Sequence, residues 1–239
     1  MTDRRAADTD RLYALLGDLA ARLGGTRHLP TTTSGLPSHG VYFFFEPAET
    51  RADGSPRVVR VGTHALTAAS RATLRGRLAQ HRGNIGGRFP GGGNHRGSIF
   101  RRHIGTALLA SGNWDPAVAA AWTAHRAGAA ARAVEYPLER AVSARLVAMP
   151  LLWLPVPAAA DRGRVERNSI ALLSHRTGGI DSPSPQWLGR HAAAERVRTS
   201  GLWNVNHVDE AYDPAYLDLF AQLVDSTPTL ADRPTPAFE

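Results

Sequence analysis

The chain has 239 residues, of which 43% are hydrophobic, with a formal net charge of +7 and no cysteine. This length corresponds to one large domain or two small ones, and it allows a substantial core. The missing cysteines exclude disulfides, zinc sites with thiolate ligands and cysteine nucleophiles. All 28 basic residues are arginines, which excludes sites that need a lysine, such as the Walker A loop. So basic a chain is suited to binding a polyanion.

No apolar run is long enough to span a membrane. The N-terminal segment MTDRRAADTD is polar and carries acids, which is not typical of a signal or transit peptide. The absence of cysteine also fits a reducing compartment. We therefore expect a cytoplasmic protein.

The hydrophobic pattern predicts an α/β protein. Strands are expected at residues 40–46, 57–63 and 151–157, and helices at 11–23, 73–83, 98–110, 133–149, 161–174 and 214–224. Turn residues at 49–57 are able to join the first two strands in a hairpin. Ser98 and Asp161 are predicted helix N-caps. Because there is no internal repeat and no clean linker, residues 1–239 are expected to form a single domain.

The predicted helix 73–83 carries a candidate phosphate-binding pair. Leu74 and Leu78 are four residues apart and anchor the helix inward. Arg77 and His81 are also four apart, so they lie one above the other on an adjacent face. A cation next to a titratable imidazole suits a site that handles phosphate. The alternative is a solvated basic helix face.

Glu166 is a second candidate, because of its place on a predicted helix. On a helical wheel it lies between Ile170 and Leu173, inside the apolar arc. A carboxylate there must be paired, hydrogen-bonded or bound to a metal. It is therefore either the partner of a buried arginine or a ligand for a hard cation such as Mg²⁺.

The first two predicted strands carry further polar side chains. Alternation along VVRVGTH places Val58, Arg60 and Gly62 on one face of a short strand. Tyr42 follows Gly40 at the start of the apolar strand GVYFFFE, where a tyrosine by itself indicates only a core position.

The order of these features resembles the GIY-YIG nuclease superfamily. The tripeptide GVY at 40–42 corresponds to its first motif and RVG at 60–62 to its second, so Arg60 stands where a second tyrosine is usual. The arginine and histidine of the following helix and the metal-binding glutamate after the third strand correspond to Arg77, His81 and Glu166.

This resemblance covers about residues 38–175, which leaves an N-terminal helical arm, 1–37, and a C-terminal extension, 176–239. It implies an α/β (α+β) fold with a small central three-stranded, mainly antiparallel sheet flanked by helices, and extra N- and C-terminal helices. The GTH after the second motif, the segment NHRGSIFRRHIG and the tail WLG…SGLWNV are more particularly similar to the restriction endonucleases of this superfamily.

The resemblance implies hydrolysis of a DNA phosphodiester with one divalent metal ion, Mg²⁺ or Mn²⁺, held by Glu166. Arg77 would then donate to the non-bridging oxygens as charge grows on them. Either neutral His81 or a phenolate of Tyr42 would accept the proton of the attacking water, and the sequence does not choose between them. Arg60 would stabilise that phenolate or bind phosphate directly.

One polar residue of the superfamily pattern has no counterpart at its usual place. It is expected about a dozen positions after the glutamate, where this chain has Gly178. Asn204 in GLWNVNH is our candidate replacement, and we count it with the catalytic residues.

A DNA-contacting element is expected around the start of the helix 98–110. The segment NHRGSIFRRH combines arginines with amide and imidazole groups at a helix N-terminus, which favours phosphate. The candidates for DNA contact are Asn94, His95, Arg96, Arg101 and Arg102. Arginines that read guanine would suit a GC-rich site. A palindromic site calls for a two-fold homodimer.

The leading interpretation is a type II restriction endonuclease that acts on double-stranded DNA, with a cognate methyltransferase in the same system but not as a physical partner. A repair or mobile-element nuclease is the nearest alternative. A non-catalytic DNA-binding protein on a degenerate GIY-YIG fold is a second, motivated by Arg60. A third is a histidine-metal nuclease built from NHRG and WNVNH, whose spacing fits no common pattern. A basic structural protein would leave Glu166 unexplained.

Overall fold

A computed structural model describes residues 2–29, 35–67, 69–125 and 128–229. Its strands are β1 (Gly40–Thr50), β2 (Pro56–Gly62) and β3 (Leu151–Pro155). Its helices are α1 (Thr2–Leu23), α2 (Leu74–Arg82), α3 (Ile99–Ser111), α4 (Pro116–Thr123), α5 (Ala129–Ala148), α6 (Ala159–Leu173), α7 (Glu195–Ser200) and α8 (Tyr216–Asp225).

The three strands form one antiparallel sheet in the order β2-β1-β3. β1 is the central strand, and its first seven residues are buried. This place suits its aromatic and β-branched composition. Tyr42 pairs with Gly62 on one side and with Trp153 on the other. The predicted three-stranded sheet flanked by helices is confirmed.

Successive side chains of β1 face two different helical layers. Phe43 points to the layer of α1, α6 and α8, where its ring centre lies 5.7 Å from that of Phe220. Tyr42 and Phe44 point to the opposite layer, and the ring of Phe44 lies 5.4 Å from that of Phe100 on α3. The face of β1 that carries Tyr42 is therefore covered by α2 and α3.

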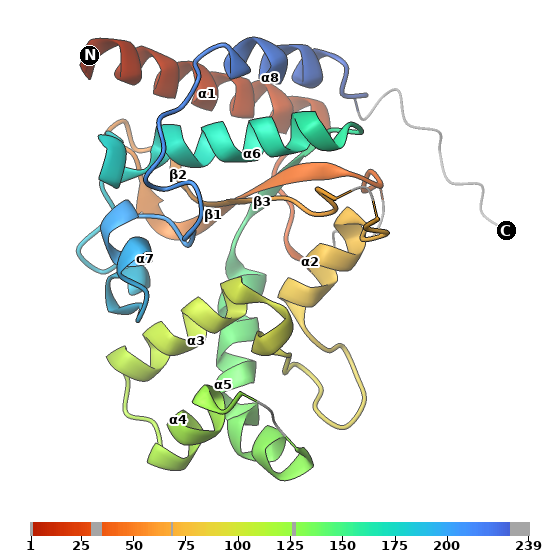
Figure 1. Cartoon of the computed structure of the whole chain (residues 1–239), viewed down its shortest axis with the longest axis vertical. Coiled ribbons are helices and arrows are strands. Elements are labelled where there is room, and N and C mark those ends of the chain that lie inside the picture. The colour runs from red at the N-terminus through yellow and green to blue at the C-terminus, as the bar shows by residue number, and fades with distance from the viewer. Residues whose placement is uncertain (1, 30–34, 68, 126–127, 230–239) are drawn as a thin grey trace, which may run out of the picture.

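The helices gather on either side of the sheet in different ways. In Figure 1, α1 and α8 lie side by side and α6 runs between them and the sheet. On the other side α3, α4 and α5 pack on one another and extend away from the strands. We call α3, α4 and α5 the helical lobe. The extra N- and C-terminal helices thus pack together, whereas the expectation of a single domain stays a prediction.

The tail after α7 covers the open edge of β2. The Trp203 amide donates to the Val59 carbonyl at 2.7 Å. The Asn204 side chain accepts from the Val61 amide at 3.2 Å and donates to the Val61 carbonyl at 2.8 Å. An unpaired strand edge is a liability for aggregation, and this segment removes it.

Several local expectations are wrong. Asp161 lies in the first turn of α6, and its N-cap is Ala158. α1 begins well before residue 11, and α4 and α7 were not predicted. No helix in the described part of the chain has both the length and the apolarity that a membrane crossing requires.

Candidate active site

The centre of the candidate site is a buried pair from β1 and α2. The Tyr42 hydroxyl oxygen lies 2.8 Å from His81 Nε2, and His81 Nδ1 lies 2.8 Å from the Ser98 hydroxyl. Ser98 is the N-cap of α3, so the helical lobe fixes the imidazole from the far side. Burial lowers the pKa of His81 well below its usual value, and the charges of Arg77 and Arg60 lower it further. His81 is therefore neutral near pH 7.

Gly62 leaves the space that the Tyr42 hydroxyl occupies. A Cβ built on Gly62 would lie 2.3 Å from the Tyr42 hydroxyl oxygen, closer than real contacts allow. The β1–β2 register places these two residues opposite each other. The glycine that ends the RVG motif is thus needed because any side chain at Gly62 would collide with Tyr42 on the opposite strand.

Arg60 enters the same region from β2. Its side chain is buried, donates to the Trp203 carbonyl, and lies 4.7 Å from the centre of the Phe100 ring. Burial lowers the pKa of Arg60, while nearby Tyr42 and Glu166 act to raise it. The residue in the slot of the second tyrosine therefore lies among the other expected catalytic residues.

Glu166 is the one glutamate without an ion pair among the glutamates that the structure describes. Its carboxylate is half-buried and accepts one hydrogen bond, from the Thr63 amide at 3.1 Å. Burial raises the pKa of Glu166, although Arg60 and His207 counteract this shift. The other glutamates, each paired with an arginine, are Glu46, Glu49, Glu135, Glu139, Glu195 and Glu210.

The hydrogen bond between Thr63 and Glu166 joins residues that line two different cavities. One, of about 440 Å³, is lined by Thr63 and by Arg77 of α2. The other, of about 550 Å³, is lined by Glu166 and by His207 from the tail. A phosphodiester placed across this junction would have a guanidinium donor on one side and a carboxylate on the other, which suits a metal-assisted hydrolysis.

Asn204 is not presented to either cavity. Both polar atoms of its amide are bonded to the backbone of Val61, and the residue is buried. Its hydrogen-bonding capacity therefore serves the edge of the sheet rather than a substrate.

Arg101, a candidate for DNA contact, is not presented to solvent. Its side chain is fully buried and donates to the Glu139 carboxylate, to the His81 carbonyl at 2.8 Å and to the Ser143 hydroxyl at 2.9 Å. Arg102, the next residue, is exposed, and its side chain has no hydrogen bond or ion pair with any described residue.

Three other residues of the expected DNA-contacting set also have partners within the protein, although Asn94 is exposed. His95 is buried and stacks on Trp122, with ring centres 3.7 Å apart. Arg96 forms a bidentate ion pair with Glu135 at 2.8 and 2.9 Å. Asn94 accepts a hydrogen bond from the Arg96 amide. Of the five candidates, Arg102 alone has a free charged side chain in this conformation.

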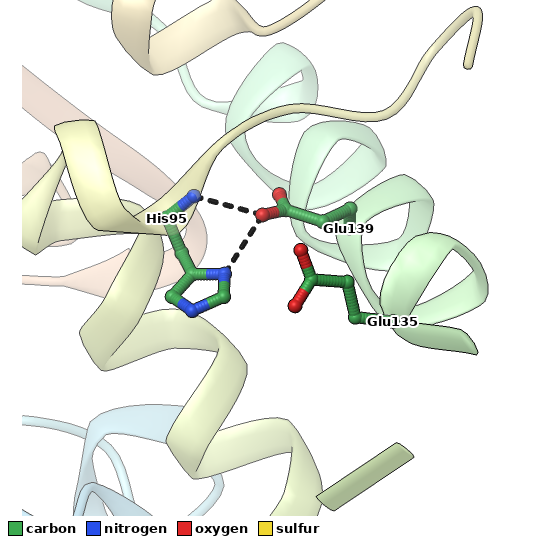
Figure 2. A group of neighbouring side chains, drawn as sticks. All are labelled: His95, Glu135 and Glu139. Atoms are coloured by element: carbon green, nitrogen blue, oxygen red, sulfur yellow. Dashed lines mark hydrogen bonds and ion pairs between the residues drawn. The ribbon is translucent and has the colours of Figure 1, made fainter. Parts of the chain in front are cut away.

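His95, Glu135 and Glu139 bring three potential metal ligands within 4.8 Å of one another. Figure 2 shows that the backbone nitrogen and the ring Nδ1 of His95 both bond to the Glu139 carboxylate, with Glu135 beside them. Burial acts to raise the pKa of Glu139, but the hydrogen bond from His95 and the charge of Arg101 hold it below its usual value. Because Arg96 and Arg101 already balance the two carboxylates, this cluster is complete without an ion.

Three contacts of the candidate site have no counterpart in the leading catalytic scheme that the sequence predicts. Thr63 positions Glu166, Ser98 positions His81, and His207 shares the cavity of Glu166. Ser98 was predicted as a helix cap, but its contact with a histidine 17 residues earlier depends on how α3 packs on α2.

Comparison with known proteins finds one family. The family model described as GIY-YIG domain matches residues 3–230, which is most of the chain. No curated protein and no solved structure matches.

Proposed function

Because this chain belongs to the GIY-YIG domain family, whose members are nucleases, we propose that it is a type II restriction endonuclease that cuts double-stranded DNA. The family accounts for a nuclease-type function with DNA as the substrate. The restriction activity, a GC-rich palindromic site, a homodimer, a cytoplasmic location and a methyltransferase in the same system belong to our proposal.

The observation that carries the catalytic proposal is the unpaired carboxylate of Glu166. GIY-YIG nucleases generally use a divalent metal, and carboxylate oxygens are preferred ligands of Mg²⁺. Elsewhere in the described chain, buried glutamates are neutralised by arginines. Glu166 lies near Arg60 and Arg77 but is paired with neither, so burying its charge costs free energy that a bound cation would offset. The donor set therefore fits a metal ion at Glu166.

The residues of the site divide the reaction between them. Glu166 would hold Mg²⁺ or Mn²⁺, which when bound supplies positive charge opposite the leaving oxygen. Arg77, from the neighbouring cavity, would donate to the non-bridging oxygens of the phosphate. Arg60 would add positive charge beside the Tyr42 hydroxyl, where it would stabilise negative charge that develops during the reaction.

The hydrogen bonds of His81 favour Tyr42 as the acceptor of the water's proton, although both side chains are buried and neither lines the two cavities in this conformation. Both ring nitrogens of His81 already face hydroxyl groups, so this imidazole is able to act only through Tyr42. The water would transfer its proton to the Tyr42 oxygen while the proton of Tyr42 passes to neutral His81. Ser98 would hold the imidazole in place for this transfer.

A non-catalytic DNA-binding protein is the second candidate function. The observation that favours it is Arg60, whose side chain is tied to the Trp203 carbonyl in a slot where the family usually has a tyrosine. In that case DNA binding would not depend on the metal ion.

Plasmid cleavage separates the two functions. Purified protein is incubated with supercoiled plasmid and Mg²⁺ or EDTA, and Glu166→Gln and Glu195→Gln variants are compared. Glu195 is a surface glutamate paired with Arg176, so it controls for loss of a carboxylate elsewhere. We expect discrete fragments with wild type and Glu195→Gln, and none with EDTA or Glu166→Gln. Intact plasmid that is bound equally by every variant would refute the nuclease proposal.

A further inference from the structure

His207 lies in the same cavity as Glu166, although it is far along the chain in the segment WNVNH. The imidazole is close enough to act electrostatically on the Glu166 carboxylate. This histidine has no role in the catalytic scheme above.

The loop that carries His207 is fastened to α6, the helix of Glu166. The Ser174 hydroxyl donates to the Val208 carbonyl at 2.7 Å, and the Asp213 amide donates to the Asn168 side chain at 2.7 Å. Both bonds lie C-terminal to His207, and the first is made by the residue that follows it directly. His207 is therefore held at a fixed place over the helix.

A carboxylate also sets the orientation of the imidazole. His207 Nδ1 lies 2.9 Å from the Glu210 carboxylate, and Glu210 is itself ion-paired with Arg167 of α6. No hydrogen bond within the described residues uses the other ring nitrogen, Nε2. A histidine whose Nδ1 is held by a carboxylate while Nε2 is free has the arrangement common among metal-ligating histidines.

The backbone at His207 is unusual. Its φ of +63° is in the left-handed region, which is unfavourable for a residue with a side chain. Such conformations persist where the surrounding structure imposes them, and they cluster at functional sites. The contacts of the loop to α6 supply that constraint here.

From these observations we propose that His207 is a second protein ligand for the divalent cation held by Glu166, and that the site favours Mn²⁺ over Mg²⁺. The proposal rests on the metal site of the proposed function. Imidazole nitrogen binds first-row transition ions better than Mg²⁺, which prefers oxygen ligands. Glu210 is a positioning residue, because it acts on the metal only through His207.

The test is direct metal binding by the full-length, metal-free protein. Mn²⁺ is titrated into wild type, His207→Ala, Glu210→Gln and Glu166→Gln, and free Mn²⁺ is measured from its electron paramagnetic resonance signal. His191→Ala is the control, because His191 is an exposed histidine outside the cavity. We expect His207→Ala to weaken Mn²⁺ binding by about tenfold or more, a loss comparable to that from removing a metal-site partner. Glu210→Gln should weaken it less, and His191→Ala should not change it.

Competition with Mg²⁺ gives a second readout. His207→Asn keeps a residue type that tolerates the left-handed backbone, and it replaces the imidazole nitrogen with an amide oxygen. We expect this variant to lose most of the preference for Mn²⁺, and it serves in place of His207→Ala should that variant not fold.

The outcomes separate this inference from the proposed function. Wild-type affinity and preference in the His207 variants, together with lost binding in Glu166→Gln, would overturn the role of His207 and leave the metal site of Glu166 standing. Unchanged binding in Glu166→Gln would overturn both.

Discussion

Arg101→Gln should destabilise the protein strongly, although the sequence places this arginine in a DNA-contacting segment. The change removes the guanidinium that neutralises the buried Glu139 and that donates to the His81 carbonyl. Breaking one side of a buried ion pair costs about 3–5 kcal/mol, because the remaining charge is left uncompensated. For a chain of this length that corresponds to a fall in melting temperature of roughly 6–20 °C.

Arg102→Gln is the matched control, one residue away on the same helix. Its side chain is exposed and unpaired within the described residues, so the unfolding free energy should change by no more than about 0.5 kcal/mol. If Arg102 contacts a phosphate, DNA affinity should fall, and the dependence of log affinity on log salt should become shallower by about 0.9.

Urea unfolding followed by tryptophan fluorescence measures the stability difference. Trp122 reports on the helical lobe, because it stacks on His95, which bonds to Glu139. A cycle with Glu139→Gln should be non-additive, since the two residues share one interaction. Wild-type stability in Arg101→Gln, or a large loss in Arg102→Gln, would refute the assignment of these two arginines.

Three further predictions follow from the site. Gly62→Ala should displace Tyr42, and thereby lower the unfolding free energy by about 1–3 kcal/mol and abolish cleavage. Gly17→Ala is the control, because it has open space around it and should not destabilise the protein. Urea unfolding and the plasmid assay measure both effects. Asn204→Ala should lower the unfolding free energy by about 1–3 kcal/mol, because it leaves the buried N–H and C=O of Val61 without hydrogen-bond partners. Its kcat should be retained at temperatures where the variant stays folded. Burial lowers the pKa of His81 in the folded protein, so only the unfolded chain binds a proton at this residue as the pH falls below about 6.5. The unfolding free energy should therefore fall there by up to about 1.4 kcal/mol per pH unit. Equal dependence of the unfolding free energy on pH in wild type and His81→Gln would contradict this.

The sequence by itself determined the elements that carry the candidate site. Strand and helix periodicity placed Tyr42 and Arg60 on neighbouring strands, and Arg77 and His81 on the following helix. These assignments depend on local hydrophobic patterns and glycine positions, which neighbouring residues encode. The order of the motifs also indicated the GIY-YIG superfamily, and the family match over residues 3–230 confirms it.

Only the tertiary structure decided which charges are free. Arg101 and Arg102 are adjacent and chemically identical, but Arg101 meets a carboxylate 38 residues away on α5 and Arg102 meets none among the described residues. Glu166 has no arginine partner among the described residues. His207 lines the same cavity as Glu166 because the loop after α7 is bonded to Ser174 at the end of α6. The ionic partner of a side chain is set by long-range packing, which has no local periodic signal. For this reason the sequence identified the elements of the candidate site, whereas the fold separated the structural arginines from those available to a substrate.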